Sequence, residues 1–222
     1  MIMSENLIAI LPELWISIGQ TFLMLGIGVA CAIVLGGPLG VLLFQMGPNQ
    51  SLENRPVYTV VSWVVNTVRS FPFIILLVVL APMTTLLVGT SIGPLAASVP
   101  LSAAAVPYFA RLVEQSLREV PRGVIEAAEA MGASQFQIVC RVLVREARSG
   151  LMLALTVLAV SFLSYSAVAG VVGGGGIGDL AIRYGYYRFQ TDVMLLTVAL
   201  LIVLVQIIQF GGNAIAHRLD KR

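Results

Sequence analysis

Charged residues are scarce in this chain, and so are the side chains that most enzymes use for catalysis. Only 11% of the 222 residues are charged, whereas roughly 25% is usual in a soluble domain, and 58% are hydrophobic. The single histidine, His217, lies among basic residues near the end of the chain, and no catalytic constellation can be built around it. The composition predicts a membrane protein with several spans and no catalytic residue.

The sequence also lacks the signals of a disulfide, a metal site and a nucleotide-binding site. Cys31 lies in an apolar run and Cys140 in a polar one, so they are expected at different depths and predict neither a disulfide nor a metal site. No phosphate-binding loop with a Gly-Lys-Ser/Thr ending occurs, so any ATP hydrolysis must be done by a different chain. The net charge of +2 is too small and scattered to predict nucleic-acid binding. We therefore expect no cofactor or metal in this chain.

The apolar residues fall into five runs, and a helix needs about 20 such residues to cross a bilayer. The runs are 15–44, 57–81, 92–110, 151–172 and 193–210. They predict an all-α integral membrane protein with five transmembrane helices, forming one transmembrane domain over residues 1–222. In the first run, Gly36, Pro38 and Gly40 predict a kink or a close helix contact.

The basic residues predict how the spans are oriented. Outside the runs, all Lys and Arg except Arg183 and Arg188 fall on one side of a five-span topology. By the positive-inside rule, the loop 111–148 and the C-terminus, with Lys221 and Arg222, are expected in the cytoplasm, and the N-terminus outside. No Lys or Arg precedes the first run, so a cleavable signal peptide is not expected.

The polar loop 111–148 contains the signals of two short helices. Pro121 fits the first turn of a helix and Gly132 fits its C-terminal cap. Ser134 and Gln137 then fit the capping box of a second helix. The loop is therefore expected to hold two helices joined at Gly132.

The first of these helices has little side-chain bulk, which would allow the backbone of another protein to approach closely. Its small residues are Ala127, Ala128, Ala130 and Gly132, and Glu126 and Glu129 give it a charged edge. The negative charge of Glu126, near the first turn, interacts favourably with the helix dipole. Glu126 would also be placed to pair with a basic residue of a partner. The alternative is that the whole segment is a solvated amphipathic connector.

Two features within the spans indicate a path for a solute. Arg69 is costly at hydrocarbon depth, so it either reaches the inner interface or faces a partner or water. In the fourth run, helical spacing places hydroxyl and apolar side chains on one face: Ser161, Ser164, Tyr165 and Val168. Such a face suits a zwitterion with an apolar side chain. Alternatively, the serines pack helices together or bond to carbonyls one turn earlier.

The polar loop resembles the EAA loop of ABC-importer permeases, whose pattern is Glu-Ala-Ala, three residues, Gly, nine residues and Ile-x-Leu-Pro. The corresponding residues are Glu126-Ala127-Ala128, Gly132, Val142 and Val144. Arg145 stands where the pattern has proline. Further stretches resemble the methionine-importer permeases: Arg69-Ser70-Phe71-Pro72-Phe73-Ile74, Val106-Pro107-Tyr108-Phe109-Ala110-Arg111, Tyr165-Ser166-Ala167 and Tyr184-Gly185-Tyr186.

This resemblance implies a type I importer permease of the bacterial inner membrane. Two copies of the chain would form a homodimer surrounded by membrane lipid, and each would dock one ATP-binding subunit through the coupling helix at 126–132. ATP and Mg²⁺ would be bound by those subunits, and a periplasmic or lipid-anchored methionine-binding protein would deliver the substrate. Methionine would cross by alternating access.

Three other functions stay open from the sequence. The same pattern would suit a permease for another amino acid or small solute. A channel would need a ring of charged or carbonyl groups, and no run carries a clear acidic ring. A membrane anchor would not need the polar residues and glycines of the fourth run.

Overall fold

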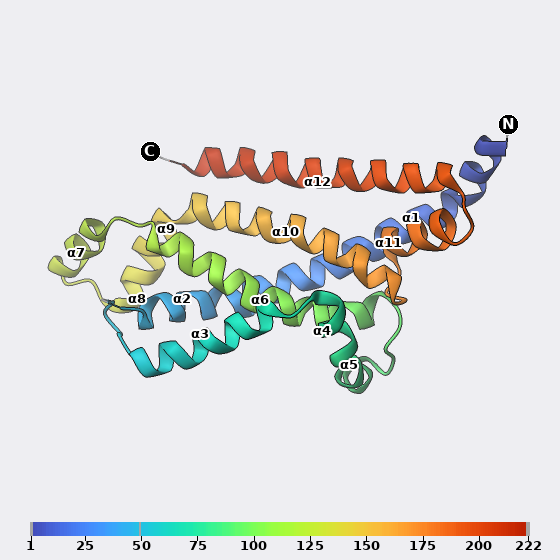
Figure 1. The fold of residues 1–222 in the computed structure, drawn as a ribbon. Coiled ribbons are helices and arrows are strands. Elements are labelled where there is room, and N and C mark those ends of the chain that lie inside the picture. The colour runs from blue at the N-terminus through green and yellow to red at the C-terminus, as the bar shows by residue number, and fades with distance from the viewer. Residues whose placement is uncertain (1, 49, 221–222) are drawn as a thin grey trace. The chain divides into compact units, whose positions relative to one another are not determined.

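The computed structural model describes residues 2–48 and 50–220, with side chains from residue 8, and in this part the chain consists of helices and turns (Figure 1). Lys221 and Arg222, which we counted as cytoplasmic, lie outside the described residues. The α-helices are α1 Ile2–Cys31, α2 Gly37–Met46, α3 Arg55–Ser70, α4 Phe73–Val79, α5 Ala81–Val88, α6 Pro94–Arg118, α7 Arg122–Ala130, α8 Gln135–Gln137, α9 Val144–Glu146, α10 Arg148–Val171, α11 Gly176–Leu180 and α12 Thr191–Leu219. Three π-helical segments lie between them: Ala32–Gly36, Ile138–Leu143 and Ala181–Tyr186.

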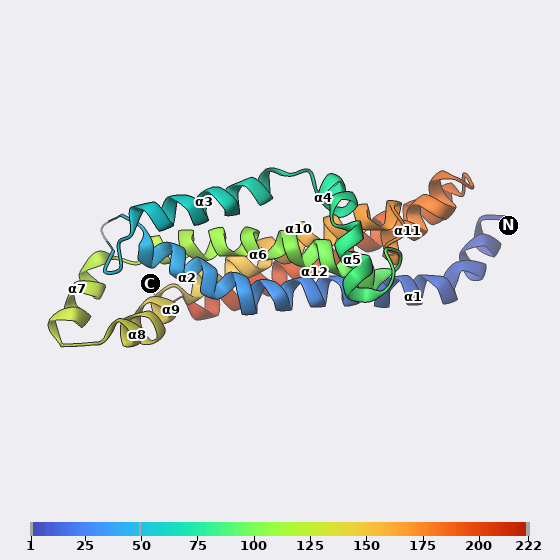
Figure 2. The same ribbon diagram turned by 90° about the horizontal axis from the view of Figure 1, so that it is seen from below.

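Four helical stretches are long and apolar enough to cross a membrane: Ile8–Met46, Pro94–Arg118, Arg148–Val171 and Thr191–Leu219. A fifth crossing exists if α3 and α4, which are separated by a break at Phe71 and Pro72, are taken as one broken span (Figures 1 and 2). The predicted all-helical membrane fold is thus confirmed. However, the expected single helix over 57–81 is divided.

The division follows from Pro72. Proline has no N–H for the hydrogen-bond ladder of α3, and it disfavours helical geometry at the residue before it, Phe71. The chain resumes a helix at Phe73, where the N–H groups of Ile75 and Leu76 donate to the carbonyl oxygen of Pro72 at 2.9 and 3.1 Å. The loop expected at 111–148 is also shorter, because α6 continues to Arg118.

Contacts divide the described chain into two compact units. Unit 1 comprises residues 1–30, 71–104 and 159–208, and unit 2 comprises residues 31–70, 105–158 and 209–222. Within the described residues, unit 1 contains only two basic residues, Arg183 and Arg188, and unit 2 contains all the others. The asymmetry of charge along the sequence is therefore also an asymmetry between the two units.

The core of unit 2 forms where α2 and α3 pack with the last part of α6. A Cβ atom at Gly36 would lie 2.6 Å from the carbonyl oxygen of Val106, and one at Gly40 would lie 2.5 Å from that of Ala110. These two glycines let the first span approach the backbone of α6, so the predicted close helix contact is confirmed. Three buried residues complete this core: Leu43, Val65 and Ala110.

Unit 1 is built around equally close contacts between α10 and α11. A Cβ atom at Gly170 would collide with the backbone nitrogen of Asp179, and one at Gly178 would collide with the carbonyl of Ala167. Side chains of α1 then satisfy the free N–H groups at the start of α11. Gln20 accepts from Gly176 at 2.7 Å, and Thr21 accepts from Ile177 at 3.0 Å. The glycine run after the fourth span therefore forms a tightly packed turn.

An ion network ties the first residues of unit 1 to its last segment. Arg183 donates to Glu13 at 2.6 Å and to Asp179 at 2.7 Å, and the hydroxyl of Tyr184 donates to Glu13 at 2.5 Å. This hydrogen bond, together with burial, raises the pKa of the Tyr184 phenol above its usual value. The guanidinium of Arg188 lies 4.3 Å from the centre of the Tyr184 ring.

The glycine contact in unit 2 gives a prediction with a matched control. Gly40→Ala places a methyl group against the α6 backbone, so it should lower the free energy of unfolding by about 1–3 kcal/mol. Gly26→Ala, at a helical position with no atom within 4 Å, should leave stability unchanged or raise it by up to about 1 kcal/mol. Thermal unfolding of both variants in detergent measures the difference. Equal melting would contradict the close approach.

Candidate functional site

The polar loop contains α7, which ends in a Schellman motif. The N–H of Ala133 donates to the carbonyl of Ala128 at 3.1 Å, and the N–H of Gly132 donates to that of Glu129 at 2.9 Å. Gly132 has a φ of +78°, which favours glycine, and no atom lies within 4 Å of the place a Cβ would occupy. The predicted glycine cap is confirmed. Within this chain, Gly132 serves the turn and not a close contact.

The second predicted helix start is also confirmed. The N–H of Ser134 donates to the Gln137 side chain at 2.9 Å, and the N–H of Gln137 donates to the Ser134 hydroxyl at 3.4 Å, which is a capping box. The helical path then passes through the π-helical segment and α9 to a turn at Ala147. This turn before α10 forms although Arg145 stands where the EAA pattern has proline.

The exposed surface of this loop differs from the predicted small face. α7 packs against the π-helical segment Ile138–Leu143, and Ala128 is only 3% exposed. Ala128 therefore belongs to the interior of the loop, because it lies on the side of α7 that its own chain covers. The other residues predicted to meet a partner are exposed: Glu126, Ala127, Glu129 and Gly132.

Two large apolar side chains stand at the tip of the loop, and the sequence analysis missed both. Met131 is 81% exposed and Phe136 is 77% exposed, on either side of the Gly132 turn. Figure 1 shows α7 at the left edge of the ribbon, beyond the ends of α2 and α3 in the same unit. Apolar side chains held out from a polar segment are characteristic anchors of protein interfaces. The signal in the sequence is two apolar residues five apart around a glycine.

A buried polar seam joins α6 to α3. Glu114 is 2% exposed and accepts hydrogen bonds from Arg111 at 2.5 Å, Arg118 at 2.7 Å and Tyr58 at 3.0 Å. Arg111 extends the seam to Ser62 and, at 3.2 Å, to Asn66 on α3. The sequence analysis did not single out Glu114. Its i−3 and i+4 arginines were the available signal.

The residues predicted to line a pathway lie in both units. Arg69 stands in the last turn of α3 in unit 2, exposed, with its guanidinium 5.5 Å from the centre of the Tyr108 ring. The α10 residues belong to unit 1, where Tyr165 stacks on Phe73 at 4.9 Å between ring centres. Ser164 is exposed, whereas Ser161 and Val168 are half-buried. Their role in transport stays a prediction.

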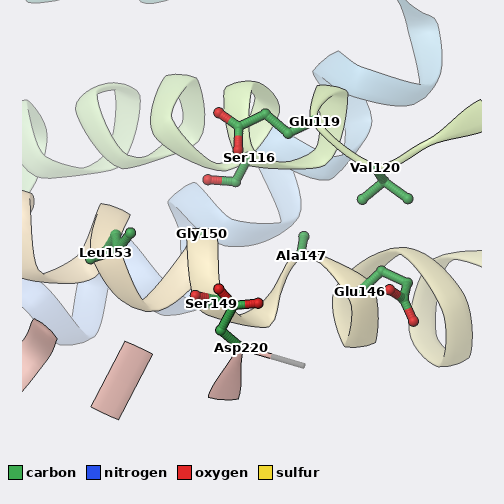
Figure 3. A pocket seen from close by; sticks show the side chains of 9 residues that line it. All are labelled: Ser116, Glu119, Val120, Glu146, Ala147, Ser149, Gly150, Leu153 and Asp220. Carbon is green, nitrogen blue, oxygen red and sulfur yellow. The ribbon is translucent and has the colours of Figure 1, made fainter. Parts of the chain in front are cut away.

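A cavity of about 160 Å³ lies in unit 2 beside the polar loop (Figure 3). It is lined by Ser116, Glu119, Val120, Glu146, Ala147, Ser149, Gly150, Leu153 and Asp220. Three of these nine carry carboxylates and none is basic, so the cavity does not offer a counter-charge for the carboxylate of an amino acid. Among the described residues, no group of three His, Cys, Asp or Glu is placed to hold a metal ion.

A helical membrane chain with four or five spans and a protruding EAA-type segment is the permease subunit of an ABC importer. The family model of the binding-protein-dependent transport system inner membrane component matches residues 32–222. The chain belongs to this family.

Relatives agree along nearly the whole length. A probable D-methionine transport system permease protein, MetI, of Vibrio cholerae is 49% identical over 203 residues, covering 91% of this chain and 90% of that protein. The methionine import system permease protein MetP of Bacillus subtilis is 41% identical and covers 96% of both chains.

Solved structures agree as well. A chain of the inward-facing MetNI methionine ABC transporter superposes with a TM-score of 0.94 at 43% identity, covering 96% of this chain and 99% of that one. An amino acid ABC transporter with histidines shares the fold, with a TM-score of 0.78 at 17% identity, covering 96% of this chain and 97% of that one.

The seam yields a stability prediction. Glu114→Gln removes the only carboxylate between Arg111 and Arg118, and breaking a buried ion pair costs about 3–5 kcal/mol. The variant should therefore melt at a clearly lower temperature in detergent. Glu119→Gln, at an exposed position just beyond α6, should change stability by less than about 0.5 kcal/mol. Indistinguishable melting of Glu114→Gln and the parent protein would refute the structural role of the seam.

Proposed function

We propose that this chain is the membrane subunit of a methionine importer. The observation that carries the proposal is the likeness to a chain of a methionine ABC transporter, at 43% identity over almost all of both chains. Two copies of the chain form a homodimer, each bound to one ATP-binding subunit. That partner holds ATP and Mg²⁺ and hydrolyses the nucleotide, and a methionine-binding protein delivers the substrate on the outer side.

The docking site for the ATPase is the loop tip between α7 and α8. Met131 and Phe136 enter an apolar groove of the partner, while Glu126, Ala127, Glu129 and Gly132 form the surrounding surface. Aromatic and methionine side chains that become fully buried contribute most of the free energy of such interfaces. The coupling role is thus assigned to the exposed side of α7 and to the two apolar side chains after it.

Contacts within unit 2 provide a path from this tip to the spans. α7 packs on Ile138–Leu143, which leads through α9 into α10. At the start of α10, Arg148 donates to the carbonyl of Leu219 at 2.8 Å and Ser149 donates to that of Ala216 at 3.1 Å, both on α12. Displacement of α7 by the ATPase therefore moves the ends of α10 and α12 together. This motion opens the pathway alternately to each side.

The proposal is tested by uptake. Vesicles containing the chain, its ATPase and its binding protein should accumulate labelled methionine only when ATP is present. Phe136→Glu places a charge in the docking contact, so both uptake and co-purification of the ATPase should fall by about tenfold or more, the change that corresponds to 1.4 kcal/mol.

Phe189→Glu is the matched control for docking. Phe189 is 86% exposed and lies outside the spans in unit 1, so this variant should retain the ATPase. Loss of the ATPase in both variants, or in neither, would contradict the docking site. Failure of the parent assembly to import methionine, with uptake of another solute intact, would replace methionine by that solute.

The proposed orientation places the polar loop in the cytoplasm and the segment before α12 outside. Cys140 is exposed in the loop, so in a Cys31→Ala background it should react with an impermeant thiol reagent only after the cells are permeabilised. Tyr187, which is 65% exposed, provides the outer position. Tyr187→Cys in a chain without the native cysteines should react in intact cells. Labelling of Cys140 in intact cells would reverse the topology.

A further inference from the structure

One face of α3 carries a continuous polar stripe. Tyr58, Ser62, Asn66 and Arg69 follow one another at spacings of four, four and three residues, which place them on the same side of a helix. The first three have hydrogen-bond partners on α6: Tyr58 contacts Glu114 and Arg118, and Ser62 and Asn66 accept from Arg111. Only Arg69 continues the stripe beyond this seam.

The seam leaves Arg69 without a counter-charge. Its single carboxylate, Glu114, is shared by Arg111 and Arg118, which leaves no acid of the seam for Arg69. Among the described basic residues of α3 and α6, Arg69 is the one that has no carboxylate within 4 Å. Its guanidinium lies 5.5 Å from the centre of the Tyr108 ring.

The position of Arg69 along α3 makes this excess charge costly. Arg69 is 14 residues beyond Arg55, and at 1.5 Å per residue the two are separated by about 21 Å along the helix. The hydrocarbon core of a bilayer is about 30 Å thick, so Arg69 lies beyond its middle when the depth is counted from the start of α3. A charge within the core is costly unless it reaches an interface or faces a partner or a water-filled path, and we consider the last of these for Arg69.

We infer that Arg69, with Tyr108 beside it, binds the carboxylate of the transported amino acid during its passage. This inference rests on the proposed function and adds a specificity-determining residue to it. A guanidinium offers a planar pair of N–H donors that matches a carboxylate, and a zwitterionic cargo supplies one negative group for the unpaired positive charge. Arg69 is exposed on the chain, so its guanidinium is open to a bound carboxylate.

The inference is tested by replacing the charge and then restoring it. In the uptake assay, Arg69→Gln should lower methionine uptake about tenfold or more while ATP hydrolysis is retained, because a charge-assisted pair of hydrogen bonds is lost. Arg69→Cys, in a chain without Cys31 and Cys140, should be equally impaired. Reaction with a cationic methanethiosulfonate should restore uptake, whereas a neutral reagent of similar size should not.

Arg188→Gln is the matched control. Arg188 also lies over a tyrosine ring and has no carboxylate within 4 Å, but it is outside the spans, so its loss should leave uptake intact. Each assay is run in two sets of vesicles. One set consists of phosphatidylcholine alone, and the other also contains anionic phospholipid. A defect of Arg69→Gln seen only with the anionic phospholipid would identify lipid as the occupant and overturn the inference.

The remaining outcomes also decide the matter. Unimpaired uptake by Arg69→Gln, equal repair by the neutral reagent, or a defect that neither reagent repairs would overturn the inference and leave Arg69 a structural residue. If the parent assembly imports no methionine, the proposed function itself fails. Import by the parent assembly with an unimpaired Arg69→Gln variant removes the carboxylate site alone.

Discussion

A carboxylate that is 2% exposed within a membrane helix is tolerated only when positive charge surrounds it, and Glu114 obtains that charge from the turns before and after it. These two ion pairs also fix the positions of the arginine side chains. Arg111 is thereby directed at α3, which it binds through Ser62 and Asn66. The pair between Glu114 and Arg118 lies within the last turn of α6, which continues to Arg118. The polar loop therefore begins later than the apolar pattern indicates. Because no second acid is present in the seam, the charge of Arg69 is left over.

Local chemistry determined what could be predicted from the sequence. The caps at Gly132 and at Ser134 with Gln137 depend on residues a few positions apart, so their signals were readable. The division of the second span was also readable in principle from Pro72, but an apolar count over 57–81 ignores backbone geometry. The burial of Ala128 was not readable, because it depends on the segment that folds against α7.

That segment shows why helical periodicity fails here. Ile138 and Leu143 are five residues apart and both are 2% exposed. An α-helix would direct them to different sides, whereas the i→i+5 bonding of a π-helical turn brings them toward one side. The interior of the loop is filled by Ala128, Ile138 and Leu143. Met131 and Phe136 are therefore left on its surface. The loop thus has a packed interior of its own.

The two ion networks differ in their access to solvent, and they will therefore respond differently to ionic strength. Arg183, which joins Glu13 and Asp179 in unit 1, has a side chain 42% exposed, and dissolved ions weaken such exposed pairs as the salt concentration rises. Glu114 in unit 2 is out of reach of those ions. Rising salt should loosen the attachment of the first residues of α1 in unit 1 and leave the seam in unit 2 intact. The chain thus carries one attachment that the dissolved ions around it can tune, and one that they cannot.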